Sequence, residues 1–146
     1  MLVKISNGVV ETYPYSVRQL RSDNPNVSFP KNIPTNILSD YGVERVNIIT
    51  PVYDHLVQTV NYPDTPTLVE SNWVLSGTAV NLSETDSEEN VRAERDRLLL
   101  ETDEYALSDR TMTSEMTAYR QALRDVPTQS GFPFSVMWPT NPEAEE

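Results

Sequence analysis

The sequence predicts an α+β protein, in which a small antiparallel β-rich module precedes a helical hairpin and an extended tail rich in aromatic residues and proline. The first half alternates apolar and polar residues over short stretches, as half-buried strands do. From Ser83 onward, the apolar residues recur at helical spacing instead. The charge shifts at the same place: residues 1–83 hold five basic and seven acidic side chains, and residues 84–146 hold six and fifteen. We therefore predict two domains, a β-rich module at 1–83 and a helical domain at 84–146.

The composition argues against several classes of function. The net charge is −11 over 146 residues, and a protein that neutralises phosphates needs a basic face, so we expect no nucleic-acid partner. An anionic membrane surface is disfavoured for the same reason, and no apolar run approaches the ~20 residues that span a bilayer. The first ten residues lack the apolar core and cleavage signal of a secretory leader.

Catalytic and metal-binding chemistry is also not expected. The chain has no cysteine and one histidine, His55, so a cysteine or histidine zinc site and a histidine-dependent triad are disfavoured. Asp54-His55 comes without a nucleophile and is interpreted as a surface turn. The acidic residues after Ser83 lack the glycine-turn spacing of a calcium loop and suit the positive start of a helix. We expect no catalytic residues, no metal, no cofactor, no small-molecule substrate and no enzymatic activity.

Local signals predict the elements of the first half. Asn7-Gly8 readily takes the positive dihedrals of a type I′ turn, and Ser16 is a good helix cap. The expected elements are a hairpin over 2–13, a helix over 17–21, a short helix capped by Thr35 or Asn36 and ended by Gly42, and strands over 43–50, 55–62, 67–69 and 73–82.

Two capped helices are predicted in the second half. Ser83 or Ser87 can cap the first helix and Thr113 the second, which Pro127 ends. The apolar stripes are Val91, Leu98, Leu99 and Thr102 on the first helix, and Met116, Tyr119, Leu123 and Val126 on the second. Residues 105–110 form the turn between them. We expect Met116, Tyr119 and Leu123 to face Val91 and Leu98.

Residues of the second helix and the tail are the predicted partner-binding residues. They are Arg120, Arg124, Phe132, Pro133, Phe134, Trp138 and Pro139. The two arginines stand at i and i+4, where they can clamp carboxylates of a partner, or else pair with acids of their own chain such as Asp103, Asp109 or Asp125. Residues 132–139 either reach a partner or fold back over the helical pair and complete its core. Both alternatives are open from the sequence.

An ordered set of motifs carries a resemblance. The motifs are residues 95–99 (RDRLL), Thr102-Asp103, Leu107-Ser108-Asp109, residues 119–125 (YRQALRD), Gly131-Phe132-Pro133 and Trp138-Pro139. In order and spacing, the carboxy-terminal half resembles the tail-assembly chaperone family of tailed bacteriophages. That family often has tryptophan after the Thr-Asp pair, where Glu104-Tyr105 stands here. The amino-terminal half resembles a module of small phage tail proteins, through Tyr13-Pro14-Tyr15-Ser16, Ser28-Phe29-Pro30 and Tyr41-Gly42-Val43.

The resemblance implies a phage tail accessory or structural protein that binds tail-fibre or baseplate and tail-tip subunits and assists their assembly. We expect it in the host cytoplasm during assembly, and afterwards in the virion tail. The alternative is a transient tail-fibre folding chaperone that is absent from the mature particle.

Overall fold

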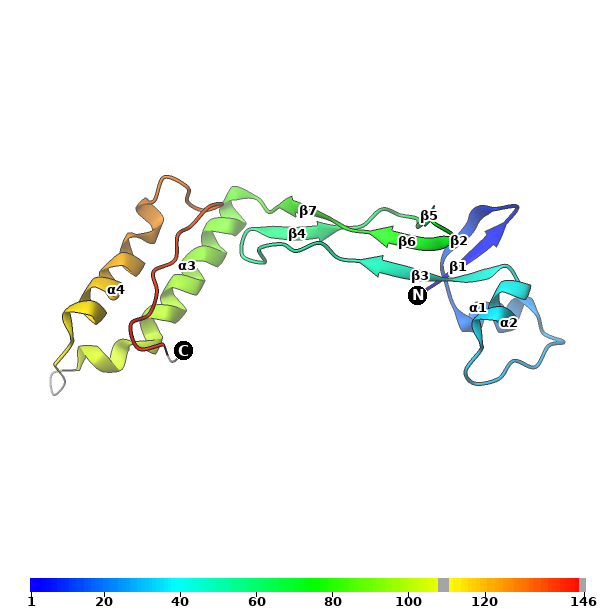
Figure 1. Cartoon of the computed structure of the whole chain (residues 1–146), viewed down its shortest axis with the longest axis horizontal. Helices are drawn as coiled ribbons and strands as arrows, with labels where there is room; N and C mark the ends of the chain where they lie inside the picture. The colour runs from blue at the N-terminus through cyan, green and yellow to red at the C-terminus, as the bar shows by residue number, and fades with distance from the viewer. Residues whose placement is uncertain (108–110, 145–146) are drawn as a thin grey trace. The chain divides into compact units, whose positions relative to one another are not determined.

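The computed structural model describes residues 1–107 and 111–144 (Figure 1). The protein is α+β, as predicted. Its described residues form two compact units: unit 1 is residues 1–52 with 60–79, and unit 2 is residues 53–59 with 80–144. The sequence-based division at residue 83 stays a prediction, and each unit is described by itself.

Unit 1 contains a five-stranded sheet with the order β2-β1-β3-β6-β5. Its strands are β1 (Leu2–Ser6), β2 (Val9–Tyr15), β3 (Val43–Ile49), β5 (Thr67–Val69) and β6 (Asn72–Ser76). Neighbours pair antiparallel except β3 and β6, which are parallel. The antiparallel prediction is wrong for this pair, because the β5–β6 hairpin sets β6 beside β3 in the same direction.

Two hairpins of unit 1 have two-residue turns. Asn7 and Gly8 have φ values of 51° and 78° between β1 and β2, which confirms the predicted type of turn. Glu70 and Ser71 connect β5 and β6 with φ values of 45° and 68°. The second turn therefore holds two residues other than glycine in the left-handed region.

The two short helices of unit 1 are α1 (Val17–Asp23) and α2 (Thr35–Asp40). The Ser16 hydroxyl accepts from the Gln19 N–H, which confirms the predicted cap. The cap predicted for α2 is wrong, because Pro34 is the N-cap and the Thr35 hydroxyl accepts from Arg45 Nε instead. Gly42 follows α2 with φ 66°, as predicted.

The core of unit 1 has two clusters. The first joins α1 and α2 to β1, β2 and β3 through Leu2, Tyr15, Leu20, Ile33, Leu38 and Val43. The second lies among the strands alone and contains Val3, Val46 and Leu75, with Ile5, Val10, Tyr13 and Trp73 packed against it.

A two-stranded sheet of β4 (Gln58–Asn61) and β7 (Thr78–Asn81) contains the boundary between the units. The strand predicted over 55–62 begins only at Gln58, since Asp54 accepts backbone N–H groups from Leu56 and Val57 and forms a turn. The strand predicted over 73–82 is interrupted at Gly77, where a Cβ would lie 2.4 Å from Val60 Cγ1.

Unit 2 is built on α3 (Glu84–Glu101) and α4 (Ser114–Asp125). Ser83 is the cap of α3 and Thr113 that of α4, each accepting a backbone N–H. Two short 3₁₀ helices follow them, η1 (Asp103–Ala106) and η2 (Val126–Thr128). Of the predicted turn and motif residues, Ser108, Asp109 and Arg110 lie outside the described residues.

The tail differs from the predicted extended segment at its beginning. Residues 131–134 form a turn with a cis peptide bond between Phe132 and Pro133, and the chain has no regular structure from Val136 to Thr140. The tail then runs along α3 and α4 (Figure 1).

The core of unit 2 also has two clusters. Met116, Tyr119 and Leu123 pack with Leu98, Leu99, Tyr105, Met112 and Trp138. Val57, Val91 and Val126 pack with Leu56, Phe132, Val136 and Trp138. The predicted stripe of α4 is confirmed, whereas Val91 packs against Val57 rather than Met116. No pattern in the sequence indicated that residues 53–59 would join this core.

Candidate partner-binding surface

Arg120 lies at the centre of a hydrogen-bonded cluster between α4 and the end of α3. It is 6% exposed. Its Nη1 donates to the Leu99 carbonyl at 2.9 Å and to Thr102 Oγ1 at 2.6 Å, and its Nη2 donates to Asp103 Oδ1 at 2.8 Å. The arginine thus joins the Thr102 N–H and hydroxyl as a donor to a terminal carbonyl of α3.

Two of the sequence motifs meet at Arg120. Thr102-Asp103 supplies two of its acceptors, and Arg120 belongs to the motif over 119–125. Pairing with Asp103 was one of the two alternatives left open by the sequence. Because the guanidinium is buried and already bonded within its own unit, it is poorly accessible to a partner's carboxylate.

Arg124 has the opposite environment. Its side chain is exposed on α4 and has no hydrogen-bond or ion-pair partner among residues 1–107 and 111–144. Of the two predicted arginines, Arg124 is therefore the one that can pair with a partner's carboxylate at little cost.

The turn at Gly131 requires glycine. The Gly131 carbonyl accepts from the Ser135 N–H at 2.7 Å, and a Cβ on Gly131 would lie 2.2 Å from the Ser135 carbonyl oxygen. The turn directs Phe132 against Val57, Val91 and Val126, and the Arg92 guanidinium lies 5.0 Å from the Phe132 ring. Pro133 is buried beside it.

The segment after this turn is held on its own helices. Trp138 is half-buried and contacts both clusters of unit 2. The Gln129 side chain bonds the backbone of Met137 twice, accepting from its N–H at 2.8 Å and donating to its carbonyl at 3.0 Å. Residues 132–139 thus take the fold-back alternative in this chain, and Pro139 is half-buried at the end of it.

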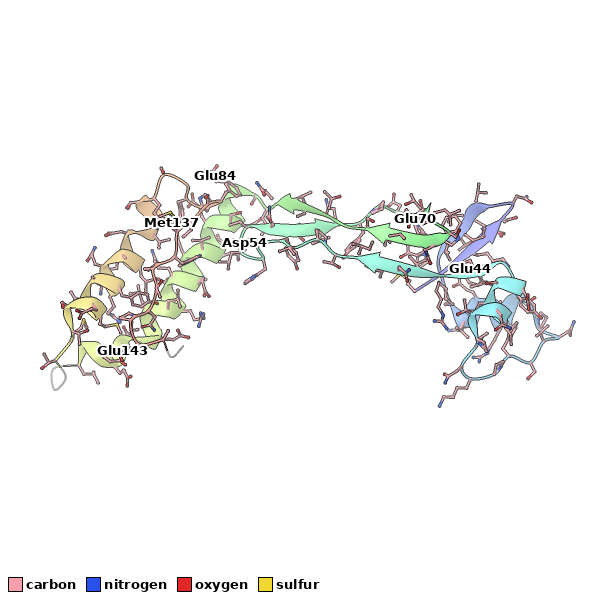
Figure 2. All side chains as sticks on the ribbon, viewed as in Figure 1. Glu44, Asp54, Glu70, Glu84, Met137 and Glu143 are labelled. Atoms are coloured by element: carbon pink, nitrogen blue, oxygen red, sulfur yellow. The ribbon has the colours of Figure 1, made fainter. Side chains whose placement is uncertain are left out.

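The outer side of the tail presents apolar side chains. Phe134 is 41% exposed and Met137 is 80% exposed, and Figure 2 labels Met137. Met137 also lines a hollow of about 390 Å³ with Gln129, Ser130, Gly131 and Ser135. Of the predicted tail residues, Phe134 is thus the most accessible to a partner.

Met137 was not predicted. Its neighbours Val136 and Trp138 turn inward, so the alternation of an extended segment turns Met137 outward. That alternation was the signal in the sequence that could have identified it.

The ion pairs of α3 join side chains on the surface of unit 2. The hydrogen bond from Arg97 holds the pKa of Glu94 below its ordinary value, against the effect of burial. Further ion pairs along α3 join Arg92 to Glu88 and Arg95 to Asp96. Such exposed pairs contribute little to stability.

The described residues include no group of three or more His, Cys, Asp or Glu side chains that could hold a metal ion. No helix within them is long and apolar enough to cross a membrane.

Comparison with known protein families gave a match in unit 2. No match was found among curated proteins or solved structures. The resemblance of the amino-terminal half is therefore without a match, and that of the carboxy-terminal half is confirmed. Residues 88–143, which include α4, most of α3 and the tail, match the model of the phage tail assembly chaperone protein family.

Proposed function

We propose that this chain is a phage tail accessory protein that binds tail-fibre or baseplate and tail-tip subunits, assists their assembly and remains in the virion tail. It meets these subunits in the host cytoplasm. The observation that carries the proposal is the family match over residues 88–143, because it covers one folded pair of helices with its tail.

The surface proposed for the partner is the outer side of the tail, with Phe134 and Met137, together with Arg124. These side chains are exposed, so a partner can reach them without opening the core of unit 2. Two exposed apolar groups, and a cation with no partner among the described residues, suit a partner surface that combines an apolar patch with a carboxylate.

Co-expression with the tail-fibre or baseplate proteins of the same phage tests this surface. We expect the wild-type chain to co-purify with one of them, and the double variant Phe134→Glu/Met137→Glu to lose it. Leu100→Glu is the matched control, since Leu100 is 71% exposed in the last turn of α3. Binding that survives the double variant, or that the control abolishes equally, would contradict the assignment of this surface.

Retention of this chain in the mature virion is a separate part of the proposal. Mass spectrometry of purified particles is expected to detect the chain in a fixed ratio to a tail protein. Its absence from intact particles would favour the second candidate, a transient folding chaperone, which the name of the matched family supports. A fibre protein that becomes soluble and trimeric only when this chain is co-expressed would support the second candidate further.

A further inference from the structure

Unit 1 contains a hollow of about 330 Å³ between its two helices and the strands β1 and β3. Its floor is made of buried side chains from the first core cluster, namely Leu2, Ile33 and Leu38. Its rim includes three exposed side chains with hydrogen-bond donors, which are Lys31, Asn32 and Arg45. The hollow is thus an apolar depression that opens to solvent past polar groups, and its size is at the lower end of that of ligand pockets.

Arg45 is held at this rim by uncharged acceptors. Its Nε donates to Thr35 Oγ1 and its Nη2 donates to the Ile33 carbonyl, both at 3.3 Å. It forms no ion pair with any residue that the structure describes. The guanidinium is therefore kept in place while its charge stays without a carboxylate, and its Nη1 is left to donate to a ligand.

No acidic residue is among the described residues that line the hollow. Register accounts for the acid next to Arg45 in the sequence: β1 pairs Leu2 with Arg45 and Val3 with Glu44. Arg45 therefore shares a face of the sheet with Leu2, whereas Glu44, labelled in Figure 2, belongs to the opposite face. Lys31 likewise has no ion-pair partner in the described part of the chain. In a chain with a net charge of −11, the hollow thus presents two cations, which favour an anionic ligand.

The apolar floor indicates which anion fits. A small inorganic anion would leave the floor without a contact, and an aspartate or glutamate side chain has no apolar group beyond its carboxylate. The last residue of a polypeptide that ends in leucine has a carboxylate and an aliphatic side chain on the same Cα atom. One such residue can therefore contact both the cations of the rim and the floor, and capture of a terminal carboxylate is a recurring mode of peptide recognition.

We propose that this hollow binds the carboxy-terminal residue of a partner polypeptide that ends in an aliphatic side chain such as leucine. The carboxylate pairs with Arg45 and Lys31, and the aliphatic side chain packs on the apolar floor. Asn32 at the rim hydrogen-bonds the last peptide group, and the rest of the partner continues outward into solvent. All the residues of this site belong to unit 1, so the proposal is independent of the tail function proposed from unit 2.

NMR titration of the isotope-labelled full chain with acetyl-Gly-Gly-Leu tests the proposal. The amide signals of Lys31, Ile33 and Arg45 are expected to shift and to saturate at millimolar peptide. The carboxy-amidated peptide is expected to bind at least about tenfold more weakly, because it has lost the charge that pairs with the rim. Acetyl-Gly-Gly-Gly is expected to bind about tenfold more weakly as well, since it has no side chain to bury. Isovalerate, an aliphatic carboxylate without a peptide group, is expected to bind more weakly than the tripeptide.

Variants of the rim identify the residues that hold the carboxylate. Arg45→Gln and Lys31→Gln are each expected to weaken peptide binding at least about fivefold, and Arg45→Lys is expected to retain more of it because the charge remains. Arg18→Gln is the matched control, since Arg18 is an exposed arginine of α1 that does not line the hollow. The Trp73 unfolding curve checks that each variant is folded.

Signals that stay unchanged up to about 10 mM peptide would overturn the proposal, as would an amidated peptide that binds as tightly as the acid. So would Arg45 and Lys31 variants that bind like the wild type, or a control that weakens binding equally. Isovalerate that binds as tightly as the tripeptide would overturn the assignment to a polypeptide. The probes are synthetic and no phage protein is needed, so a failure here is distinguishable from a failure of the proposed tail function.

Discussion

The two units differ in how they cover apolar surface. In unit 2 the tail returns over α3 and α4, and Trp138 completes both clusters. In unit 1 the helices cover one part of the sheet, while Ile48 of β3 and Leu68 of β5 stay exposed. Unit 2 covers its apolar residues with its own tail, whereas unit 1 leaves apolar side chains of β3 and β5 exposed.

In unit 2, the residues that hold the fold together differ from the exposed residues that a partner could contact. The motif residues Thr102, Arg120 and Gly131 hold unit 2 together through hydrogen bonds or a tight turn. A sequence pattern of this kind identifies how the unit folds. The side chains that meet a partner are then expected among exposed residues, and these differ from one partner to the next.

One tryptophan in each unit allows the units to be followed separately. Trp73 lies in unit 1 and Trp138 in unit 2. In a Trp73→Phe background fluorescence reports unit 2, and in a Trp138→Phe background it reports unit 1. Urea unfolding in these two backgrounds therefore measures the stability of each unit separately.

Gly131→Ala is expected to destabilise unit 2 by about 3 kcal/mol, because the new Cβ would clash with the Ser135 carbonyl oxygen at 2.2 Å. The Trp138 transition should move to lower urea while the Trp73 transition stays. Gly8→Ala is the control in unit 1, where a Cβ meets no atom within 4 Å but φ is 78°, so it should cost only about 1 kcal/mol. Equal effects of the two substitutions would contradict the role of the tight turn.

Arg120→Met is expected to cost unit 2 about 2 to 3 kcal/mol, since three hydrogen bonds of a buried guanidinium, to Leu99, Thr102 and Asp103, are lost. Arg124→Met should change the stability by less than about 0.5 kcal/mol, because that side chain is exposed. The same Trp138 unfolding curve measures both. If Arg120→Met leaves stability unchanged but abolishes co-purification with a tail protein, the arginine serves the partner rather than the fold.

Val57→Ala tests whether residues 53–59 fold with unit 2. Val57 is 4% exposed beside Val91 and Val126, and its carbonyl accepts from the Leu82 N–H. Losing its buried methyl groups is expected to cost about 2 kcal/mol in the Trp138 transition. Val52→Ala, at a fully exposed position of unit 1, should change neither curve. A shift of the Trp73 transition with Val57→Ala would break the division into these two units.

High pH should weaken unit 1 through Tyr15. Burial, with a 2.5 Å hydrogen bond to Asp23, raises the pKa of Tyr15 above its ordinary value of 10. The folded unit therefore keeps the proton longer than the unfolded chain, so this stability is complete below pH 10 and is lost as pH rises beyond it. Tyr15→Phe should cost about 1 kcal/mol at pH 8 and flatten the decline of the Trp73 transition above pH 10. An unchanged slope would show that another group titrates there.

The sequence predicted those features of the fold that depend on neighbouring residues. Asn7-Gly8, Ser16 and Thr113 act locally, and the stripe of α4 follows from helical spacing alone. The parallel pairing of β3 with β6 could not be predicted in this way, because it depends on the path of the chain between them. The addition of Val57 to the core of unit 2 depends on a contact between distant segments as well.

In the candidate site too, the features set by local spacing could be predicted, and those set by contacts between distant segments could not. That Arg120 and Arg124 share a face of α4 followed from their spacing, but which one is buried depends on where the end of α3 lies. The return of the tail over its own helices depends likewise on the Gly131 turn and the two bonds from Gln129. The sequence pattern was sufficient to identify residues 132–139 as a segment of interest. It left open whether this segment reaches a partner or folds back over its own helices.

The smallest expected effect compares the two hairpin turns of unit 1. Asn7-Gly8 and Glu70-Ser71 have similar positive φ values, but only the first pair consists of residues that tolerate them well. Ser71→Gly is therefore expected to stabilise unit 1 by about 0.5 to 1 kcal/mol, and Gly8→Ser to destabilise it by a similar amount. Both are read from the Trp73 transition. If Ser71→Gly gives no gain, contacts of the serine offset the cost of its backbone, and the β5–β6 turn is then held in place by more than its own geometry.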